Sequence, residues 1–108
     1  MDLLNKLQKI KDALTPIMDH VSHYYRASNS DRYIVWAEDA EGSSFSADNK
    51  KASQTIQGTI DLYTKKEGDP AIEQVQNNLN AAEISWYLNS VQYEEDTGFI
   101  HYEWVFEV

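Results

Sequence analysis

The amino-acid sequence predicts a single α+β domain over residues 1–108, with two helices packed on one face of an antiparallel or mixed sheet of four or five strands. Two observations predict this class. Apolar residues recur at helical spacing in two segments, and at alternate positions in the closing segment. The chain has no cysteine, so disulfides are excluded. A chain of this length buries about two thirds of its unfolded surface, which is enough for a core without a metal.

Each predicted helix carries one apolar stripe. The first stripe consists of Leu3, Leu7, Ile10 and Leu14. This helix should end near Thr15, because the residue before Pro16 is disfavoured in the helical region. The second helix should begin with Asp69 as its cap and Pro70 at the first helical position, and should run to about Ala82. Its stripe consists of Ile72, Val75, Leu79 and Ala82.

Three strands are predicted between the helices. Residues 17–25 are rich in β-branched and aromatic side chains, and residues 33–38 are apolar on both faces, as in a central strand. Residues 56–63 alternate, with Gly58 at a place typical of a bulge or of a closely packed helix. Residues 39–53 are long and polar, so we expect them to leave the sheet, with room for a short strand of their own.

A β-hairpin is predicted to close the chain. Its strands cover residues 84–93 and 99–108, and Gly98 supplies the positive φ that the turn between them requires. In the last strand, the side chains expected to face the core are Ile100, Tyr102, Trp104, Phe106 and Val108. The opposite face is a candidate surface for a protein partner, with ordinary scattered aromatic residues as the alternative. That surface consists of Tyr63, Tyr87, Tyr93, His101 and Val105.

Acidic residues are concentrated in the C-terminal part of the chain. The net charge is −9, and residues 69–108 hold eight acidic and no basic side chains. This part repels phosphate, so binding to a nucleic-acid backbone is not expected there. Glu94, Glu95 and Asp96 lack the ligand order of a calcium loop, so we expect a water-exposed turn. No apolar run approaches the about 18 residues of a membrane span, and no leader cleavage site is evident, so the cytoplasm is the expected location.

The chain offers few groups for catalysis. Its four glycines are scattered, so no phosphate-binding loop is predicted. The serines at 43, 44 and 46 lack the strand, turn and helix around a catalytic serine. His20 and His23 would lie on opposite faces of a strand, and no carboxylate stands at a ligand-like spacing beside them or His101, so no metal site is predicted. We therefore expect neither an enzyme nor a cofactor.

Several motifs, by their order and spacing, resemble small phage and prophage proteins of Gram-positive bacteria. In that group an F-x-ADNK segment leads into a strand, a turn and a helix that begins with Asp-Pro, and an aromatic-rich hairpin closes the chain. The matching residues here are Phe45, 47–50, 60–66, Asp69, Pro70 and 102–108. Arg32 departs from the pattern, because it stands where a proline is expected before the 33–38 strand. The group is similar to the tail completion, or tail terminator, proteins of long-tailed phages.

This resemblance implies a structural role. Subunits of such proteins form a ring, usually of six, at the head-proximal end of the tail tube, where they stop tube growth and meet the head connector. The implied partners are further copies of the chain, the tail tube protein and the head connector protein, while DNA passes without specific binding. Assembly would occur in the cytoplasm of the bacterial host, and the final location would be the tail or neck of the virion.

Two groups of residues are candidates for this role. The polar 39–53 segment has the length to reach a neighbouring subunit or the tube, with a surface loop as the alternative. Phe45 would be its apolar anchor, and its polar contacts would come from Asp48, Asn49, Lys50 and Lys51. The acidic turn of Glu94, Glu95 and Asp96 would line the lumen, where repulsion of phosphate lets DNA slide.

Other hypotheses stay open. A different head–tail joining protein of the phage neck would share the size and the ring. An acidic DNA mimic that inhibits a basic host enzyme would suit the charge, and it predicts a monomer or dimer that binds a nucleic-acid enzyme. A small enzyme is the least expected class, because catalytic groups are scarce.

Overall fold

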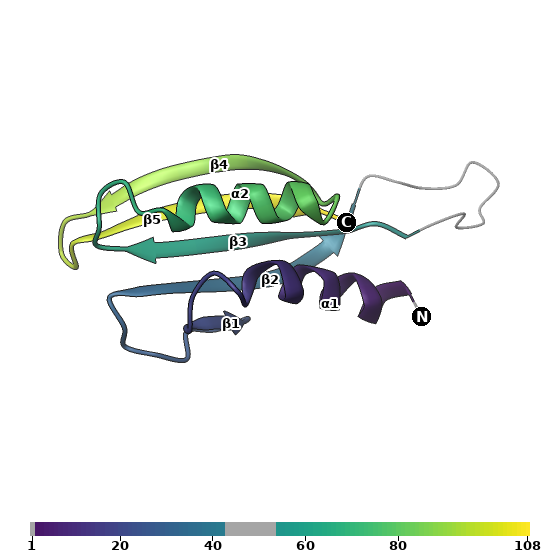
Figure 1. Ribbon diagram of the computed structural model, residues 1–108, viewed down its shortest axis with the longest axis horizontal. Helices are drawn as coiled ribbons and strands as arrows, with labels where there is room; N and C mark the ends of the chain where they lie inside the picture. Colours follow the sequence, from purple (N-terminus) through teal and green to yellow (C-terminus); the bar gives the residue numbers. More distant parts are fainter. Residues whose placement is uncertain (1, 43–53) are drawn as a thin grey trace.

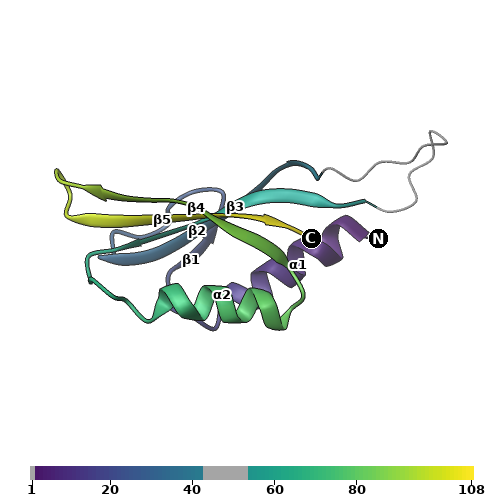
Figure 2. The same cartoon turned by 90° about the horizontal axis from the view of Figure 1, so that it is seen from above.

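The computed structural model describes residues 2–42 and 54–108. Its elements are α1 (Asp2–Leu14), β1 (Val21–His23), β2 (Arg32–Glu41), β3 (Ile56–Thr64), α2 (Ala71–Ala81), β4 (Ser85–Glu94) and β5 (Phe99–Glu107). The strands form one sheet in the order β1-β2-β3-β5-β4, with β1 parallel to β2 and the other neighbours antiparallel. Both helices lie on the same face of this sheet (Figure 1, Figure 2), so the predicted α+β class is confirmed.

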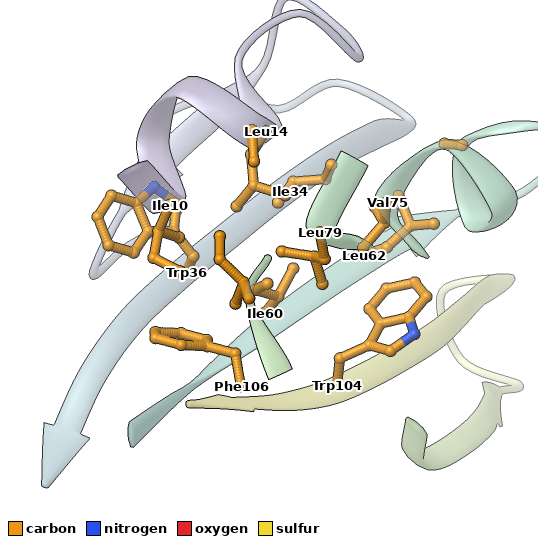
Figure 3. Close-up of a cluster of buried hydrophobic side chains, with 13 residues drawn as sticks. Ile10, Leu14, Ile34, Trp36, Ile60, Leu62, Val75, Leu79, Trp104 and Phe106 are labelled. Atoms are coloured by element: carbon orange, nitrogen blue, oxygen red, sulfur yellow. The ribbon is translucent and has the colours of Figure 1, made fainter. Parts of the chain in front are cut away.

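The hydrophobic core fills the space between the two helices and the sheet (Figure 3). Ile10 and Leu14 of α1 and Val75 and Leu79 of α2 are fully buried. They pack with the sheet side chains of Ile34, Trp36, Ile60, Leu62, Trp104 and Phe106. The predicted stripe of the second helix therefore faces the core, and that of the first does so from Leu7 onward. In the last strand, the predicted core face is confirmed at Tyr102, Trp104, Phe106 and Val108.

The helix boundaries follow from local chemistry. Helix α1 ends at Leu14, two residues before Pro16, as predicted. Helix α2 begins at Ala71, whose N–H donates to Oδ1 of Asp69 at 2.8 Å, so the predicted aspartate does satisfy a free amide at this end. Pro70 is the N-cap residue and Asp69 precedes it, so the predicted helix start is one residue too early. Neither helix has the length and apolar character that crossing a lipid bilayer requires.

The first strand is much shorter than the predicted 17–25. Only Val21–His23 form β1, and they pair in parallel with Ile34, Val35 and Trp36 of β2. Ile17 and Met18 instead pack against the core from the turn that follows α1. The apolar, β-branched composition of this segment therefore reflects burial over a helix end as well as strand pairing, and composition alone does not separate the two.

Gly58 is the site of a close backbone approach. A bulge in β2 lies between Glu38 and Ala40, directly opposite this glycine. A Cβ at position 58 would lie 2.1 Å from the carbonyl oxygen of Ala37 and 2.6 Å from Cζ of Phe106. The predicted close contact is confirmed, but the neighbours are strands and not a helix, since β2 and β5 flank β3.

A second bulge changes which face the β4 side chains occupy. Leu88 pairs with Trp104, but the next pair is Ser90 with Glu103, so Asn89 is the extra residue. Tyr87 opposes Val105 on the face away from the helices, whereas Tyr93 opposes Ile100 on the helix side. The prediction that Tyr87 and Tyr93 share a face is wrong, because one inserted residue reverses the alternation.

Candidate functional site

The face of the sheet away from the helices brings together side chains from four strands. Tyr33 of β2 pairs with Tyr63 of β3, which pairs with His101 of β5, which pairs with Gln92 of β4. These four therefore form one row across the sheet. The next row on the same face includes Asp61 opposite Glu103. The register thus places an aromatic row beside an acidic pair.

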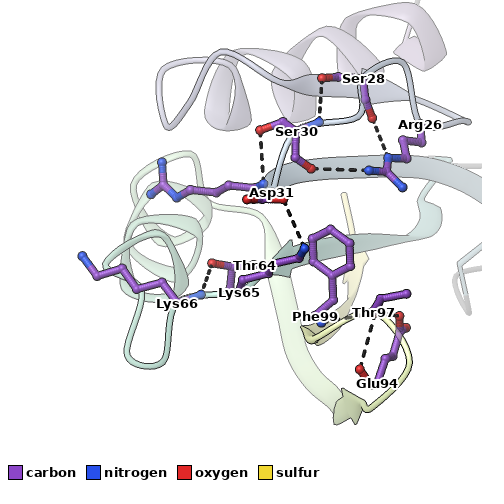
Figure 4. Close-up of polar contacts among 11 residues, drawn as sticks. Arg26, Ser28, Ser30, Asp31, Thr64, Lys65, Lys66, Glu94, Thr97 and Phe99 are labelled. Atoms are coloured by element: carbon purple, nitrogen blue, oxygen red, sulfur yellow. Dashed lines mark hydrogen bonds and ion pairs between the residues drawn. The ribbon is translucent and has the colours of Figure 1, made fainter.

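The aromatic row is closely stacked. The rings of Tyr33 and Tyr63 lie 4.7 Å apart, and those of Tyr63 and His101 lie 4.2 Å apart, both nearly parallel. Phe99 meets both tyrosines edge-on, and Arg26 lies 4.4 Å above the Tyr33 ring. Figure 4 shows Lys65 reaching past the Phe99 ring to Asp31, with Nζ and Oδ1 3.3 Å apart. These neighbours bury Phe99 although it lies on the uncovered face.

Asp61, His101 and Glu103 form a cluster next to this row. Nε2 of His101 lies 2.7 Å from Oδ1 of Asp61, and one ligand-type atom from each residue lies within 4.8 Å of the others. Nδ2 of Asn89 donates to Oε1 of Glu103 at 2.7 Å, and Oε2 of Glu94 lies 3.9 Å from Nδ1 of His101. The cluster was not predicted, because Asp61 and His101 are 40 residues apart and meet only through strand register.

Burial and negative charge shape the pKa values in this region. Burial raises the pKa of Asp61, and its hydrogen bond with His101 opposes that rise. Burial, followed by the charge of Asp61, raises the pKa of Tyr63 to about 12. Tyr63 is therefore a neutral phenol at physiological pH, and it contributes stacking to the cluster and no charge.

A second histidine–carboxylate pair lies at the β1 edge. Nε2 of His23 is 2.7 Å from Oε1 of Glu38, and the Tyr24 hydroxyl donates to the other oxygen of Glu38. Partial burial raises the pKa of Glu38, but the hydrogen bonds from Tyr24 and His23 outweigh it, so the net shift is downward. The His23 ring also stacks on Trp36 at 3.9 Å. This site has one carboxylate where the His101 cluster has two.

The predicted acidic turn lies at the end of the sheet away from both chain termini (Figure 1). Glu95 and Asp96 are exposed, while Glu94 is partly buried and accepts a hydrogen bond from the Thr97 hydroxyl (Figure 4). Gly98 has φ of +80°, as predicted for this turn. The other predicted contact residues lie outside the described residues: Phe45, Asp48, Asn49, Lys50 and Lys51.

Strand β4 is an uncovered edge with apolar side chains. Within residues 2–42 and 54–108 it pairs with β5 alone, and Leu88, Val91 and Tyr93 are 43%, 51% and 65% exposed. Its sequence, SWYLNSVQYE, contains no lysine or proline, and its charge is confined to the final glutamate. The lack of charge was visible in the sequence, but the edge position was not, because strand order depends on the whole sheet.

Comparisons with known proteins do not assign the chain to a family: no family model matches it, and no curated protein matches it. The features of the chain that bear on its function are therefore the β4 edge and the uneven distribution of charge. The residues of the matched 60–66 segment lie in β3 and in the turn that leads to α2.

Proposed function

We propose that this protein is a structural subunit of a phage or prophage, a tail terminator whose copies form a ring at the head-proximal end of the tail tube. The class of protein in this proposal comes from the resemblance of the sequence motifs to those of small phage and prophage proteins. The observation that carries self-association is the exposed edge of β4, with Leu88, Val91 and Tyr93 uncovered. The ring would assemble in the bacterial cytoplasm and remain in the tail or neck of the virion.

An uncovered edge strand favours contact with another chain. Its free N–H and C=O groups can pair with a further strand, and monomeric proteins commonly prevent this with lysine, proline or a very short edge. Strand β4 has ten residues and uses none of these, although it carries a bulge at Asn89. The opposite edge of the sheet is the three-residue β1. Protection is therefore much weaker at the β4 edge.

The two edges of the sheet differ, which favours a head-to-tail contact. Such a contact joins two unlike surfaces and produces a ring when the rotation between subunits closes. Lys6, Lys9 and Lys11 lie on α1, over the β1–β2 side, while residues 69–108 carry no basic side chain (Figure 1). The three lysines of α1 could meet the acidic C-terminal part of the next copy, and that attraction would orient the contact between β4 and the α1 side.

The test is the oligomeric state of the full chain and of Val91→Lys. For the natural sequence, light scattering after size exclusion should give the mass of a ring oligomer, and negative-stain images should show a central hole. Val91→Lys should weaken assembly at least about tenfold, because a lysine is a common device for blocking edge pairing. Gln74→Lys adds the same charge at an exposed position of α2 and should leave the ring intact. A natural chain that stays monomeric, even with the tube protein present, would contradict the proposal.

A second prediction concerns the lumen. Replacing Glu95 and Asp96 with lysine should impair DNA ejection while tails still assemble, because the new charges attract phosphate. Adding Glu94→Lys should increase the defect. The control is the double variant Glu67→Lys and Glu73→Lys, which makes the same change of charge outside the turn. It should leave infectivity unchanged. The measurement is infectivity together with electron microscopy of tails, and normal infectivity of the Glu95 and Asp96 variant would exclude a lumenal position.

The second candidate function is that of an acidic protein that inhibits a nucleic-acid enzyme. The observation that favours it is the absence of basic side chains over residues 69–108. This candidate requires a monomer or dimer that competes with DNA for a basic enzyme. The mass measurement separates the two functions, since only the first requires a closed ring.

A further inference from the structure

We propose that Asp61, His101 and Glu103 bind a divalent transition-metal ion of the zinc class. The inference is independent of the ring, since all three ligands come from one subunit. Two carboxylates and one imidazole are the donor types that such ions accept, and three protein ligands leave a position for water. Calcium and magnesium fit less well, because they favour oxygen ligands alone.

The sheet register brings the three ligands together. His101 and Glu103 are two residues apart on β5, so they share a face, and Asp61 lies directly opposite Glu103 on β3. Their ligand-type atoms lie within 4.8 Å of one another. Zinc bonds of about 2.0–2.2 Å in a tetrahedral arrangement place ligand atoms about 3.3–3.6 Å apart. Nε2 of His101 and Oδ1 of Asp61 are closer than this, at 2.7 Å, so metal binding would replace their hydrogen bond with two bonds to the ion, and an oxygen of Glu103 would complete the set.

The charge of the cluster favours a cation. Two carboxylates facing each other across neighbouring strands repel. Among the residues that the structure describes, no lysine or arginine forms an ion pair with Asp61 or Glu103, and Asp61 contacts the imidazole of His101 instead. Glu94 adds a third carboxylate near the same imidazole. A divalent ion would neutralise the charges of both Asp61 and Glu103.

The surrounding groups hold the ligands in place. Oε2 of Glu94 lies on the Nδ1 side of His101, where a carboxylate commonly orients a metal-binding imidazole whose other nitrogen faces the metal. The Tyr63 ring stacks at 14° to the imidazole plane and restricts its rotation. Asn89 donates from Nδ2 to Oε1 of Glu103 at 2.7 Å and so restrains that side chain. Asn89 is also the bulge residue of β4, and bulges re-aim side chains beside functional sites.

The His23–Glu38 pair is a control within the same chain. Its N···O distance is also 2.7 Å, and its imidazole also stacks on an aromatic ring. It has one carboxylate, and the second oxygen of that carboxylate already accepts the Tyr24 hydroxyl. If a single histidine–carboxylate pair were enough to bind metal, the His23 and His101 sites would both bind it. We expect binding at the His101 site alone.

The experiment is a calorimetric titration of the full chain, stripped of metal with chelator, with zinc chloride. We expect one ion per chain and a Kd below about 10 μM. His101→Gln should weaken binding at least about 100-fold, and Asn89→Ala, outside the ligand set, about tenfold. His23→Gln should not change the affinity. Cobalt(II) absorption should report the same site and vanish in His101→Gln.

Two results would overturn the inference. One is the absence of saturable binding below about 1 mM zinc. The other is equal loss of affinity in His23→Gln and His101→Gln, which would indicate nonspecific binding to surface histidines. Circular dichroism of each variant without metal checks that it folds. If His101→Gln does not fold, Glu103→Gln tests the same site, because it keeps the size of the side chain and removes its charge.

Discussion

Asp69→Asn should lower the free energy of unfolding by about 3 kcal/mol, because it removes the charge of a buried carboxylate that is paired with Arg32 and leaves hydrogen-bond donors unmatched. The Asp69 carboxylate is fully buried and accepts from Nε and Nη2 of Arg32 at 2.7 and 2.8 Å. It also accepts from the Thr64 hydroxyl at 2.7 Å and from the Ala71 amide at 2.8 Å. Urea unfolding followed by circular dichroism measures the change.

The exposed pair of Asp31 and Lys65 provides the matched control. Asp31→Asn removes the same kind of charge from a pair whose side chains are 78% and 44% exposed. Exposed pairs contribute about 0.2–1 kcal/mol, so this variant should unfold close to the natural protein. Equal stability of Asp69→Asn and Asp31→Asn would contradict the role assigned to burial.

The same contacts predict a dependence on pH. Hydrogen bonding from Arg32 holds the pKa of Asp69 well below its usual range, and the Ala71 amide and Thr64 hydroxyl lower it further, against the effect of burial. A carboxyl group with a lowered folded pKa stabilises the fold fully above its unfolded pKa of about 3.9. That contribution is lost as the pH falls from there toward the folded value. The stability difference between the natural chain and Asp69→Asn should therefore be largest above about pH 5 and shrink below about pH 4.

This network also gives a role to Arg32, the residue at which the sequence departs from the expected motif. Arg32 stands where a proline is expected, and the structure places it as the partner of Asp69 at the start of α2. Lys66 donates its backbone N–H to the Thr64 hydroxyl in the same turn. The matched Thr64, Asp69 and Pro70 thus shape the connection from β3 to α2, which is a folding role.

Gly58→Ala should lower the free energy of unfolding by about 3 kcal/mol, the upper part of the usual range for overpacking. The new methyl group would lie 2.1 Å from the Ala37 carbonyl oxygen and 2.8 Å from Cα of Glu38, both backbone atoms of the neighbouring strand. Backbone atoms in a paired strand cannot rotate away as a flexible side chain does. The β2–β3 pairing must therefore separate locally, and thermal unfolding should show the loss.

Gly98→Ala is the control for the general cost of replacing a glycine. Gly98 has φ of +80° and no heavy atom within 4 Å of the position of a new Cβ. Its replacement should cost about 1–2 kcal/mol, from backbone conformation alone. If Gly58→Ala is no more destabilising than Gly98→Ala, close contact with β2 is not what requires glycine at position 58.

Local patterns in the sequence determined the helices, the alternation of β5 and the hairpin turn. The stripes of α1 and α2, the stop before Pro16 and the hydrogen bond from the first amide of α2 to Asp69 depend on residues within a few positions of one another. The same holds for Gly98, because its turn is closed by the adjacent strands. Such features are readable because their energies come mainly from neighbouring residues.

The tertiary structure decided the rest. The parallel pairing of Val21–His23, the bulges opposite Gly58 and at Asn89, and the exposure of the β4 edge all depend on strand order and register. The proposed metal ligands are the clearest case, since Asp61 meets His101 only because β3 pairs with β5. A shift of one residue in that pairing would turn the side chains of one strand to the other face. Register is set by packing over the whole core, so no local pattern determines which distant side chains meet.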